Sequence, residues 1–535
     1  MSALEMDLLA VGPEITLAVG GMILLLLGVF RAPGAAEGPE VAPRNAAAGL
    51  LVSWATVALL LVTAVWVAGL EGQRIAFNGL FVDDTFARFA KVLILAGSAI
   101  VLALGLDAMR QGGILKFEYP ILILFAALGM CVMVSARDLM TLYMGLELQS
   151  LSLYIIASFQ RDSLRSTEAG LKYFVLGALS SGLLLFGASL IYGFAGSTRF
   201  DQIAAALADG GDPPVGLLFG LAFLIAGFAF KISAAPFHMW TPDVYEGAPT
   251  PVTAFFATAP KVAAAALFAR AMMTPFAEIT DAWSQILAFL AICSMFLGAF
   301  AGIGQTELKR LLAYSSIGHM GFALVALSVG GEAGVQAMLV YLAIYLVMSI
   351  GVFAFVLAMS RDGEPTTRIA DLDGLSQTHP GWAIGLTLLM FSLAGVPPLW
   401  GFFAKYAAFS AAVQGGLVWL ATAGVVASVI SAYYYLNIVR RMYFNDPERP
   451  IELNAAFPHR LCFGAAAAAM ILAIAPAPLL NGFGTEDAAA RAAASLEIGG
   501  ERAPFAAAPR EAILAEDEAA EDDAALLEAP AVLAQ

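Results

Sequence analysis

Four charged residues interrupt long apolar stretches of this chain, and their types indicate proton transfer. They are Glu147, Lys231, Lys261 and Lys405. A charged side chain inside a membrane span is costly, and such residues commonly mark ion or proton pathways. Burial disfavours the charged form of a lysine, so the amine can release its proton, whereas an arginine stays protonated. The pattern therefore predicts a proton path in which Glu147 pairs with Lys231.

Three of these residues also have a plainer interpretation. Glu147 could hold two helices together, Lys231 could extend toward the membrane interface, and Lys405 could anchor the end of a span. Lys261 follows Pro260 and has only small or apolar neighbours in the sequence. That setting favours a role in proton transfer for Lys261.

Other basic residues lie in or near apolar segments and are accessory candidates for the same path. These are Lys172, His238, Lys309 and His319. A histidine in a span is either a hydrogen-bonded core residue or a titrating group. Lys309 opens a span, where it could anchor the topology or feed protons into the path. Lys91, near the start of its span, is interpreted as a side chain that reaches the interface. Asp243 and Glu246 are assigned to a short outer loop.

Prolines interrupt two of the apolar segments that carry lysines. Pro236 follows Lys231 by five residues, and Pro397 and Pro398 precede Lys405. Proline inside a span frees backbone groups, and transporters use such broken helices beside wet cavities. Segments 231–240 and 393–405 each join a proline, a tryptophan and a lysine. The two segments lie five spans apart. Because five is odd, two units of five spans each would have opposite topologies in the membrane.

The composition requires a polytopic membrane protein. The chain has 535 residues, of which 60% are hydrophobic and 13% charged, whereas soluble domains contain about 25% charged residues. A span needs about 20 apolar residues. Fourteen spans are expected, at 11–30, 46–70, 86–106, 119–136, 139–159, 169–195, 215–240, 249–273, 284–303, 308–329, 334–359, 381–411, 416–439 and 460–480. The most polar of them are 139–159 and 308–329.

Basic residues between the spans predict the orientation. Fourteen Lys and Arg residues fall in connections that follow odd-numbered spans, against five after even-numbered spans. Cytoplasmic loops carry the excess of positive charge, so both termini are expected on the periplasmic side. Nine of the 15 net negative charges lie in the Ala-rich segment 484–535. This acidic segment is expected to be disordered or a loose helix.

Several motifs are missing from the sequence. It has no GxGxxG unit after a strand and no phosphate-binding P-loop. The three cysteines, Cys131, Cys293 and Cys462, lack the spacing of zinc or iron–sulfur sites. We therefore expect no metal, nucleotide or redox centre on this chain and no nucleic-acid partner, so that a partner protein or an ion gradient supplies the energy.

Four long segments resemble the antiporter-like subunits of respiratory complex I, the NADH-quinone oxidoreductase. They are residues 139–154, 170–187, 231–251 and 309–321, and the resemblance extends over about residues 10–480. It implies an all-α fold of fourteen helices with broken helices 7 and 12. Two inverted five-helix repeats, spans 4–8 (119–273) and 9–13 (284–440), follow three N-terminal helices (1–118) and precede the last span (460–480).

The resemblance also implies a function and a set of site residues. Glu147, Lys231, Lys261 and Lys405 match the charged residues of the family's helices 5, 7, 8 and 12. The chain would then translocate protons in a bacterial inner membrane while other subunits, which carry FMN and iron–sulfur clusters, reduce quinone. Its partners would be the other membrane and peripheral subunits and the lipid bilayer. A subunit of a multisubunit cation/proton antiporter and a non-conducting structural subunit remain as alternatives.

Overall fold

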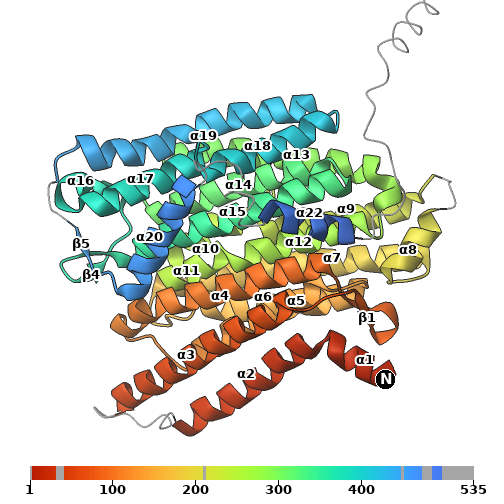
Figure 1. The fold of residues 1–535 in the computed structure, drawn as a ribbon, viewed down its shortest axis with the longest axis horizontal. Coiled ribbons are helices and arrows are strands. Elements are labelled where there is room, and N and C mark those ends of the chain that lie inside the picture. The colour runs from red at the N-terminus through yellow and green to blue at the C-terminus, as the bar shows by residue number, and fades with distance from the viewer. Residues whose placement is uncertain (1–2, 32–40, 209–211, 448–450, 473–484, 497–535) are drawn as a thin grey trace, which may run out of the picture.

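The chain folds into a bundle of long, roughly parallel and antiparallel helices (Figure 1). The computed structural model describes residues 3–31, 41–208, 212–447, 451–472 and 485–496. Its helices are α1 (Ala3–Ala10), α2 (Gly12–Arg31), α3 (Val41–Ala68), α4 (Thr85–Gln111), α5 (Glu118–Val134), α6 (Leu139–Ala157), α7 (Leu164–Ala195), α8 (Phe200–Leu207), α9 (Val215–Ile232), α10 (Trp240–Gly247), α11 (Thr250–Phe256), α12 (Ala259–Met273), α13 (Thr280–Ile303), α14 (Leu308–Ser328), α15 (Gly331–Ala358), α16 (Leu375–Thr378), α17 (Pro380–Ala394), α18 (Trp400–Gln414), α19 (Val418–Phe444), α20 (Phe457–Leu472) and α22 (Thr485–Ser495).

The expected all-α polytopic architecture is confirmed. Each of the fourteen expected spans coincides with one helix or with two consecutive helices, including the polar spans that form α6 and α14. Eleven stretches of the described chain are long and apolar enough to cross a membrane, and α5 and α17 are shorter apolar helices. Of the last expected span, residues 473–480 lie outside the described residues.

Helices 7 and 12 are broken, as expected. Span 7 consists of α9 and α10, and α9 ends at Ile232, followed by Ser233, whose φ of 63° is left-handed. Span 12 consists of α17 and α18, and α17 ends at Ala394, followed by Gly395 with a φ of 86°. The peptide bonds before Pro236 and Pro398 are cis. In each case a tryptophan, Trp240 or Trp400, begins the second helix.

Span 8 contains a third break that was not expected. Its two helices, α11 and α12, are separated at residues 257–258, where Thr258 has a φ of −118° and a ψ of −105°. Pro260 lies in the first turn of α12, a position where its missing N–H costs nothing. Lys261 therefore lies in the first turn of α12 instead of the middle of a continuous helix.

The first two helices of each proposed repeat approach each other through glycine. A Cβ on Gly129 of α5 would lie 2.6 Å from the carbonyl oxygen of Gly145 in α6. A Cβ on Gly298 of α13 would likewise lie 2.7 Å from the backbone nitrogen of Gly318 in α14. Small residues let membrane helices pack backbone to backbone. The same packing in both helix pairs fits two repeats built alike.

Short strands lie at the two ends of the bundle (Figure 1). Strands β1 (Arg74–Ala76) and β2 (Phe81–Asp83) form a hairpin at the end that holds α1 and α8. Strands β3 (Met359–Arg361), β4 (Glu364–Pro365) and β5 (Glu452–Leu453) form a small sheet near α16 at the opposite end. The hairpin therefore marks one end of the bundle, and the small sheet marks the other.

Part of the acidic C-terminal segment is helical, and a helix was one of the two states expected for it. Residues 485–495 form α22, which packs against α4 and α15. Three alanines, Ala489, Ala492 and Ala493, are buried in this contact, and the backbone N–H of Phe86 donates a hydrogen bond to Ser495 Oγ at 2.8 Å. Residues 497–535 of the expected tail lie outside the described residues.

Candidate functional site

Lys261 lies at the break in span 7. Its side chain is 1% exposed, and its Nζ donates to the carbonyl oxygen of Ile232 at 3.0 Å and to the hydroxyl of Ser233. The ammonium also lies 5.3 Å from the centre of the Trp240 ring. Ile232 is the last residue of α9, so its carbonyl has no partner within the helix. Lys261 therefore completes the end of a helix that belongs to the neighbouring span.

Lys405 makes the same kind of contact at the break in span 12. Its side chain is 4% exposed, and its Nζ donates to the carbonyl oxygen of Ala394 at 2.9 Å and to Ser428 Oγ at 2.8 Å. Ala394 is the last residue of α17. The C-terminal end of a helix carries partial negative charge, which favours a cation. Lys405 and Lys261 thus occupy corresponding electrostatic positions.

The sequence similarity between segments 231–240 and 393–405 suggested a different correspondence. It paired Lys231 with Lys405, but the two lysines lie on opposite sides of their breaks. Lys231 is the second-last residue of α9, before the break, whereas Lys405 follows the break and reaches back across it. The lysine that matches Lys405 in its contacts is Lys261.

Lys231 contacts the helix that carries Glu147 but does not bond with Glu147 itself. Its Nζ donates to Ser150 Oγ at 2.7 Å and lies 3.5 Å from the hydroxyl of Tyr154, both on α6. In the described part of the chain, no ion pair within 4.0 Å joins Lys231 to Glu147, and Glu147 Oε1 is buried without a hydrogen-bond partner. Since Ser150 lies one helical turn beyond Glu147, the two acceptors are adjacent on α6.

His319 and Lys405 line one small cavity of about 10 Å³. His319 Nδ1 lies 2.6 Å from the hydroxyl of Tyr341, and Nε2 lies 3.2 Å from the hydroxyl of Tyr435. The Tyr435 hydroxyl is in turn 2.5 Å from Ser315 Oγ. These contacts form a continuous buried row of groups that can each donate and accept a hydrogen bond. His319 is thus a hydrogen-bonded core residue that also adjoins Lys405.

The break in span 7 is joined to the second repeat by a hydrogen bond. The backbone N–H of Ala235 donates to Ser294 Oγ of α13 at 2.8 Å. The next residue, Met295, lines the small cavity that contains His319 and Lys405. Pro236, Pro397 and Pro398 all lie in the breaks, and His238 is half-buried in the first of them. Residues from both proposed repeats therefore meet at α13.

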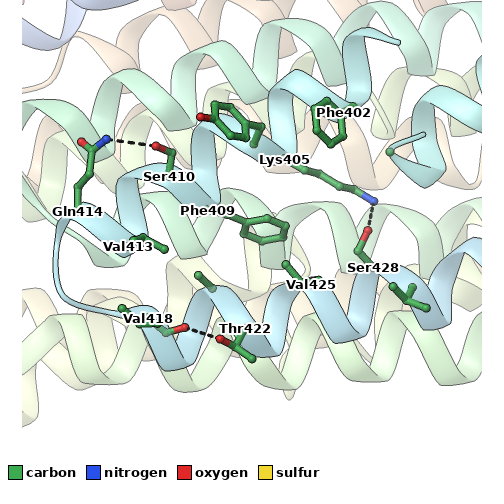
Figure 2. A pocket seen from close by; sticks show the side chains of 14 residues that line it. Phe402, Lys405, Phe409, Ser410, Val413, Gln414, Val418, Thr422, Val425 and Ser428 are labelled. Atoms are coloured by element: carbon green, nitrogen blue, oxygen red, sulfur yellow. Dashed lines mark hydrogen bonds between the residues drawn. The ribbon is translucent and has the colours of Figure 1, made fainter. Parts of the chain in front are cut away.

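A larger apolar groove leads from Lys405 along the outside of α18 and α19. Its volume is about 680 Å³. Figure 2 shows Lys405 and Ser428 at one end of the groove, Gln414 and Ser410 near the other, and Phe409 between them. Most of the lining is apolar. The groove gives Lys405 an approach from the side of the bundle.

The accessory lysines lie around α10, the second half of span 7. Lys172 bonds to Glu168 at 2.8 Å and to Asp243 at 2.7 Å, and its side chain is 41% exposed. Arg310 bonds to Asp243 at 2.8 Å and to Glu246 at 3.0 Å. The expectation of a short outer loop was wrong for both acids, because they belong to helix α10 and pair with the arginine that opens span 10. They hold α7, α10 and α14 together at one end of the bundle.

Lys309 is buried, whereas a lysine that only anchored the span at the membrane surface would be exposed. Its Nζ donates to the carbonyl oxygen of Ala248 at 2.7 Å. Ala248 follows the last residue of α10, so Lys309 contacts the end of a helix as Lys261 and Lys405 do. Its position beside the ion pairs of Asp243 and Glu246 connects the surface cluster to the interior.

Comparisons with known proteins show the family to which this chain belongs. Residues 136–431, more than half of the chain, match the family described as NADH:quinone oxidoreductase/Mrp antiporter, TM. The NADH-quinone oxidoreductase subunit N of Jannaschia sp. (strain CCS1) is 54% identical over 491 residues, which cover 92% of this chain and 99% of the relative. The subunit N of Rhodobacter capsulatus is 54% identical over 484 residues, covering 90% and 98% of the two chains. The chain belongs to the subunit N family.

Solved structures show the same fold. A chain of respiratory complex I from Thermus thermophilus with bound aureothin is 33% identical, with a TM-score of 0.73 over 88% of this chain and 98% of that one. A chain of the Mrp complex from Dietzia sp. DQ12-45-1b is 20% identical, with a TM-score of 0.74 over 91% and 97%. The second likeness concerns the fold alone. The subunit N fold is thus shared with a chain of the Mrp complex.

One charged residue of this subunit N chain was misinterpreted from its sequence. Lys91 does not reach the membrane interface, because its side chain is 1% exposed and pairs with Glu14 of α2 at 2.6 Å. The ammonium also lies 4.9 Å from the centre of the Phe81 ring. The partner lies in another span, far away in the sequence, and nothing local indicates it. Lys91 therefore ties α4 to α2.

Sequence reasoning also missed the serines that contact the buried lysines. Ser150, Ser233 and Ser428 each accept a hydrogen bond from one lysine of the candidate path. Serine is common in membrane helices, and only the position next to Lys231 and Pro236 could have drawn attention to Ser233. Among the described residues, no group of three His, Cys, Asp or Glu side chains is placed to hold a metal ion.

Proposed function

We propose that this chain is a proton-translocating membrane subunit of NADH-quinone oxidoreductase, in which quinone is reduced by other subunits. The observation that supports this most directly is the placement of Lys261 and Lys405. Each is buried at the end of a broken helix, and neither is paired with a carboxylate among the described residues. Burial disfavours the ammonium while the helix end favours it. Such opposed effects leave a lysine able both to bind and to release a proton.

The proposed path runs through Glu147, Lys231, Lys261 and Lys405. Lys231 moves between Glu147 and its present partners Ser150 and Tyr154 on the same helix. A change in this pair alters the charge near Ile232, the next residue in the chain, whose carbonyl holds Lys261. The proton then passes between Lys261 and Lys405, and these interacting groups titrate as a set.

The accessory residues extend the path toward its two ends. Lys172 and Lys309 belong to the charged cluster around α10, on the side that carries the excess of basic residues and that we assign to the cytoplasm. His238 lies in the break of span 7, and His319 adjoins Lys405. Both termini then face the periplasm. FMN and iron–sulfur clusters are expected in partner subunits.

Substitution of Lys261 by alanine in the assembled enzyme tests this function. Proton translocation in membrane vesicles and NADH oxidation coupled to quinone should both fall severely, while the peripheral subunits remain bound. Lys116→Ala provides a control, because Lys116 is exposed in a loop. An unchanged number of protons per NADH in Lys261→Ala would show that the assignment is wrong.

Two other functions make different predictions. A cation/proton antiporter subunit would bind sodium through several oxygen ligands, and the ammonium groups of the three lysines would repel that cation. Sodium transport by the isolated subunit would support the antiporter function. A non-conducting structural subunit would tolerate Lys231→Met without loss of coupling.

A further inference from the structure

Three buried or half-buried lysines of this chain are bonded to a serine hydroxyl. Lys231 donates to Ser150 Oγ at 2.7 Å. Lys405 donates to Ser428 Oγ at 2.8 Å, and Lys261 donates to the hydroxyl of Ser233. The serines come from three different segments: α6, α19 and the break between α9 and α10. The same partner therefore recurs at three unrelated backbone positions.

The other lysines of the described chain have different partners. Lys91 is held by the carboxylate of Glu14, and Lys172 by the carboxylates of Glu168 and Asp243. Lys309 donates to the backbone carbonyl of Ala248. Lys116 is exposed. A serine hydroxyl thus distinguishes the three central lysines of the proposed path from the two accessory lysines, Lys172 and Lys309, and from Lys91 and Lys116.

The chemistry of the partner explains why this distinction matters. A carboxylate or a carbonyl only accepts hydrogen bonds, so it stabilises an ammonium and offers nothing to the lone pair of a neutral amine. A hydroxyl accepts from the ammonium and, after rotation about its C–O bond, donates to the amine. It can therefore bond with the lysine in both protonation states without gaining or losing a proton itself.

The surroundings of two serines provide the second hydrogen bond that such a rotation requires. Ser150 Oγ donates to the carbonyl oxygen of Leu146 at 2.6 Å, so its own hydrogen is directed away from Lys231. Ser428 Oγ likewise lies 3.4 Å from the carbonyl oxygen of Ala394. At the third site, Thr241 donates to Ser233 Oγ at 2.6 Å. In this structure the serines are arranged as acceptors, which is the arrangement for protonated lysines.

We propose that Ser150, Ser233 and Ser428 are positioning residues for proton transfer, each holding its lysine in both the charged and the neutral state. This inference rests on the proposed function of the lysines. It assigns the serines no proton of their own to transfer. When a lysine releases its proton to the next group in the path, the serine hydroxyl turns and donates to the free amine. When the lysine is protonated again, the hydroxyl turns back.

Alanine and threonine substitutions in the assembled enzyme test this role. In Ser150→Ala and Ser428→Ala, the lysine loses a partner in both states, and proton translocation coupled to NADH oxidation should fall by about tenfold. Ser150→Thr and Ser428→Thr keep the hydroxyl and should restore most of the activity. Ser152→Ala and Thr422→Ala are matched controls, because each hydroxyl bonds only a carbonyl of its own helix, at 2.9 Å and 2.8 Å.

The outcomes separate this inference from the function on which it rests. Full pumping by both alanine variants, together with its loss in Lys231→Met and Lys405→Met, would overturn the role of the serines alone. Equal loss in the alanine and threonine variants, with normal assembly, would also overturn it, since the hydroxyl would then not be what matters. Full pumping by the lysine variants themselves would overturn the proposed function.

Discussion

The side-chain nitrogen of Lys261 lies 3.0 Å from the carbonyl oxygen of Ile232, the last residue of α9. Lys261 belongs to the following span, so one span supplies the cation that completes the helix of another. The contact exists because α9 stops inside the bundle instead of crossing it. A break in the backbone and a buried charge, each unfavourable in a membrane, thereby satisfy each other.

Replacing Lys261 by arginine separates the charge of this side chain from its ability to release a proton. We expect Lys261→Arg to assemble better than Lys261→Met, because the guanidinium can still donate to the carbonyl of Ile232. It should nevertheless translocate no protons, since arginine remains protonated in proteins. Proton uptake by reconstituted vesicles measures this, with the amount of assembled complex as the reference. Proton translocation by the arginine variant would refute a proton-releasing role.

Gly395→Ala should disturb Lys405, because Gly395 directly follows the last residue of α17 and lies against the Lys405 side chain. The φ of Gly395 is 86°, which an alanine adopts only with strain of about 1–3 kcal/mol. Its Cβ would also lie 2.9 Å from Cδ of Lys405. We expect reduced proton translocation and a lower melting temperature. Gly381→Ala within α17 is the control, because nothing lies within 4 Å of its added Cβ; equal effects of the two substitutions would contradict this account.

Lys91→Met should destabilise the N-terminal helices. The substitution leaves the carboxylate of Glu14 buried without a cation, and breaking a buried pair in this way costs about 3–5 kcal/mol. Combining it with Glu14→Gln should recover much of the loss, because no uncompensated charge then remains. Thermal unfolding and the yield of assembled complex report the effect. A single variant as stable as the wild type would place Lys91 at the interface after all.

Asp243→Asn should have a small effect on stability, despite the two ion pairs that it removes. The side chains of Asp243 and Lys172 are 36% and 41% exposed, so water screens their attraction. Exposed pairs of this kind contribute about 0–1 kcal/mol. The loss should become smaller still at high salt, as melting curves at two ionic strengths would reveal. A loss of several kcal/mol would mean that the cluster is buried in the assembled complex.

The spans and two of the breaks could be predicted because their signals are local. Hydrophobic runs of about 20 residues mark membrane helices whatever their neighbours, and Pro236, Pro397 and Pro398 interrupt such runs visibly. The break in span 8 has a similar signal in Pro260, but the surrounding alanines conceal it. A proline at the start of a helix and one inside it look alike in a continuous apolar run.

The contacts of the charged residues could not be predicted, because they depend on the rotation and depth of helices far apart in the sequence. Nothing near Lys91 indicates Glu14, and nothing near Lys405 indicates Ser428. Charge alone suggested that Lys231 pairs with Glu147, whereas its nitrogen bonds Ser150 one turn further along the same helix. The sequence therefore identified the helix that Lys231 contacts, but not the atom.

Ser294 and Met295 are consecutive residues of α13, and they reach the two repeats separately. Ser294 bonds the backbone in the break of span 7, and Met295 lines the cavity beside Lys405. Successive residues of a helix differ by about 1.5 Å along its axis, so α13 contacts the two sites at nearly the same level of the bundle. A charge that crosses the whole membrane gains or loses about 2.3 kcal/mol per 100 mV. On the proposed path, a proton that passes between the repeats at this level would move along the plane, and the membrane voltage would do almost no work on it. The voltage would act instead on the steps by which protons enter and leave.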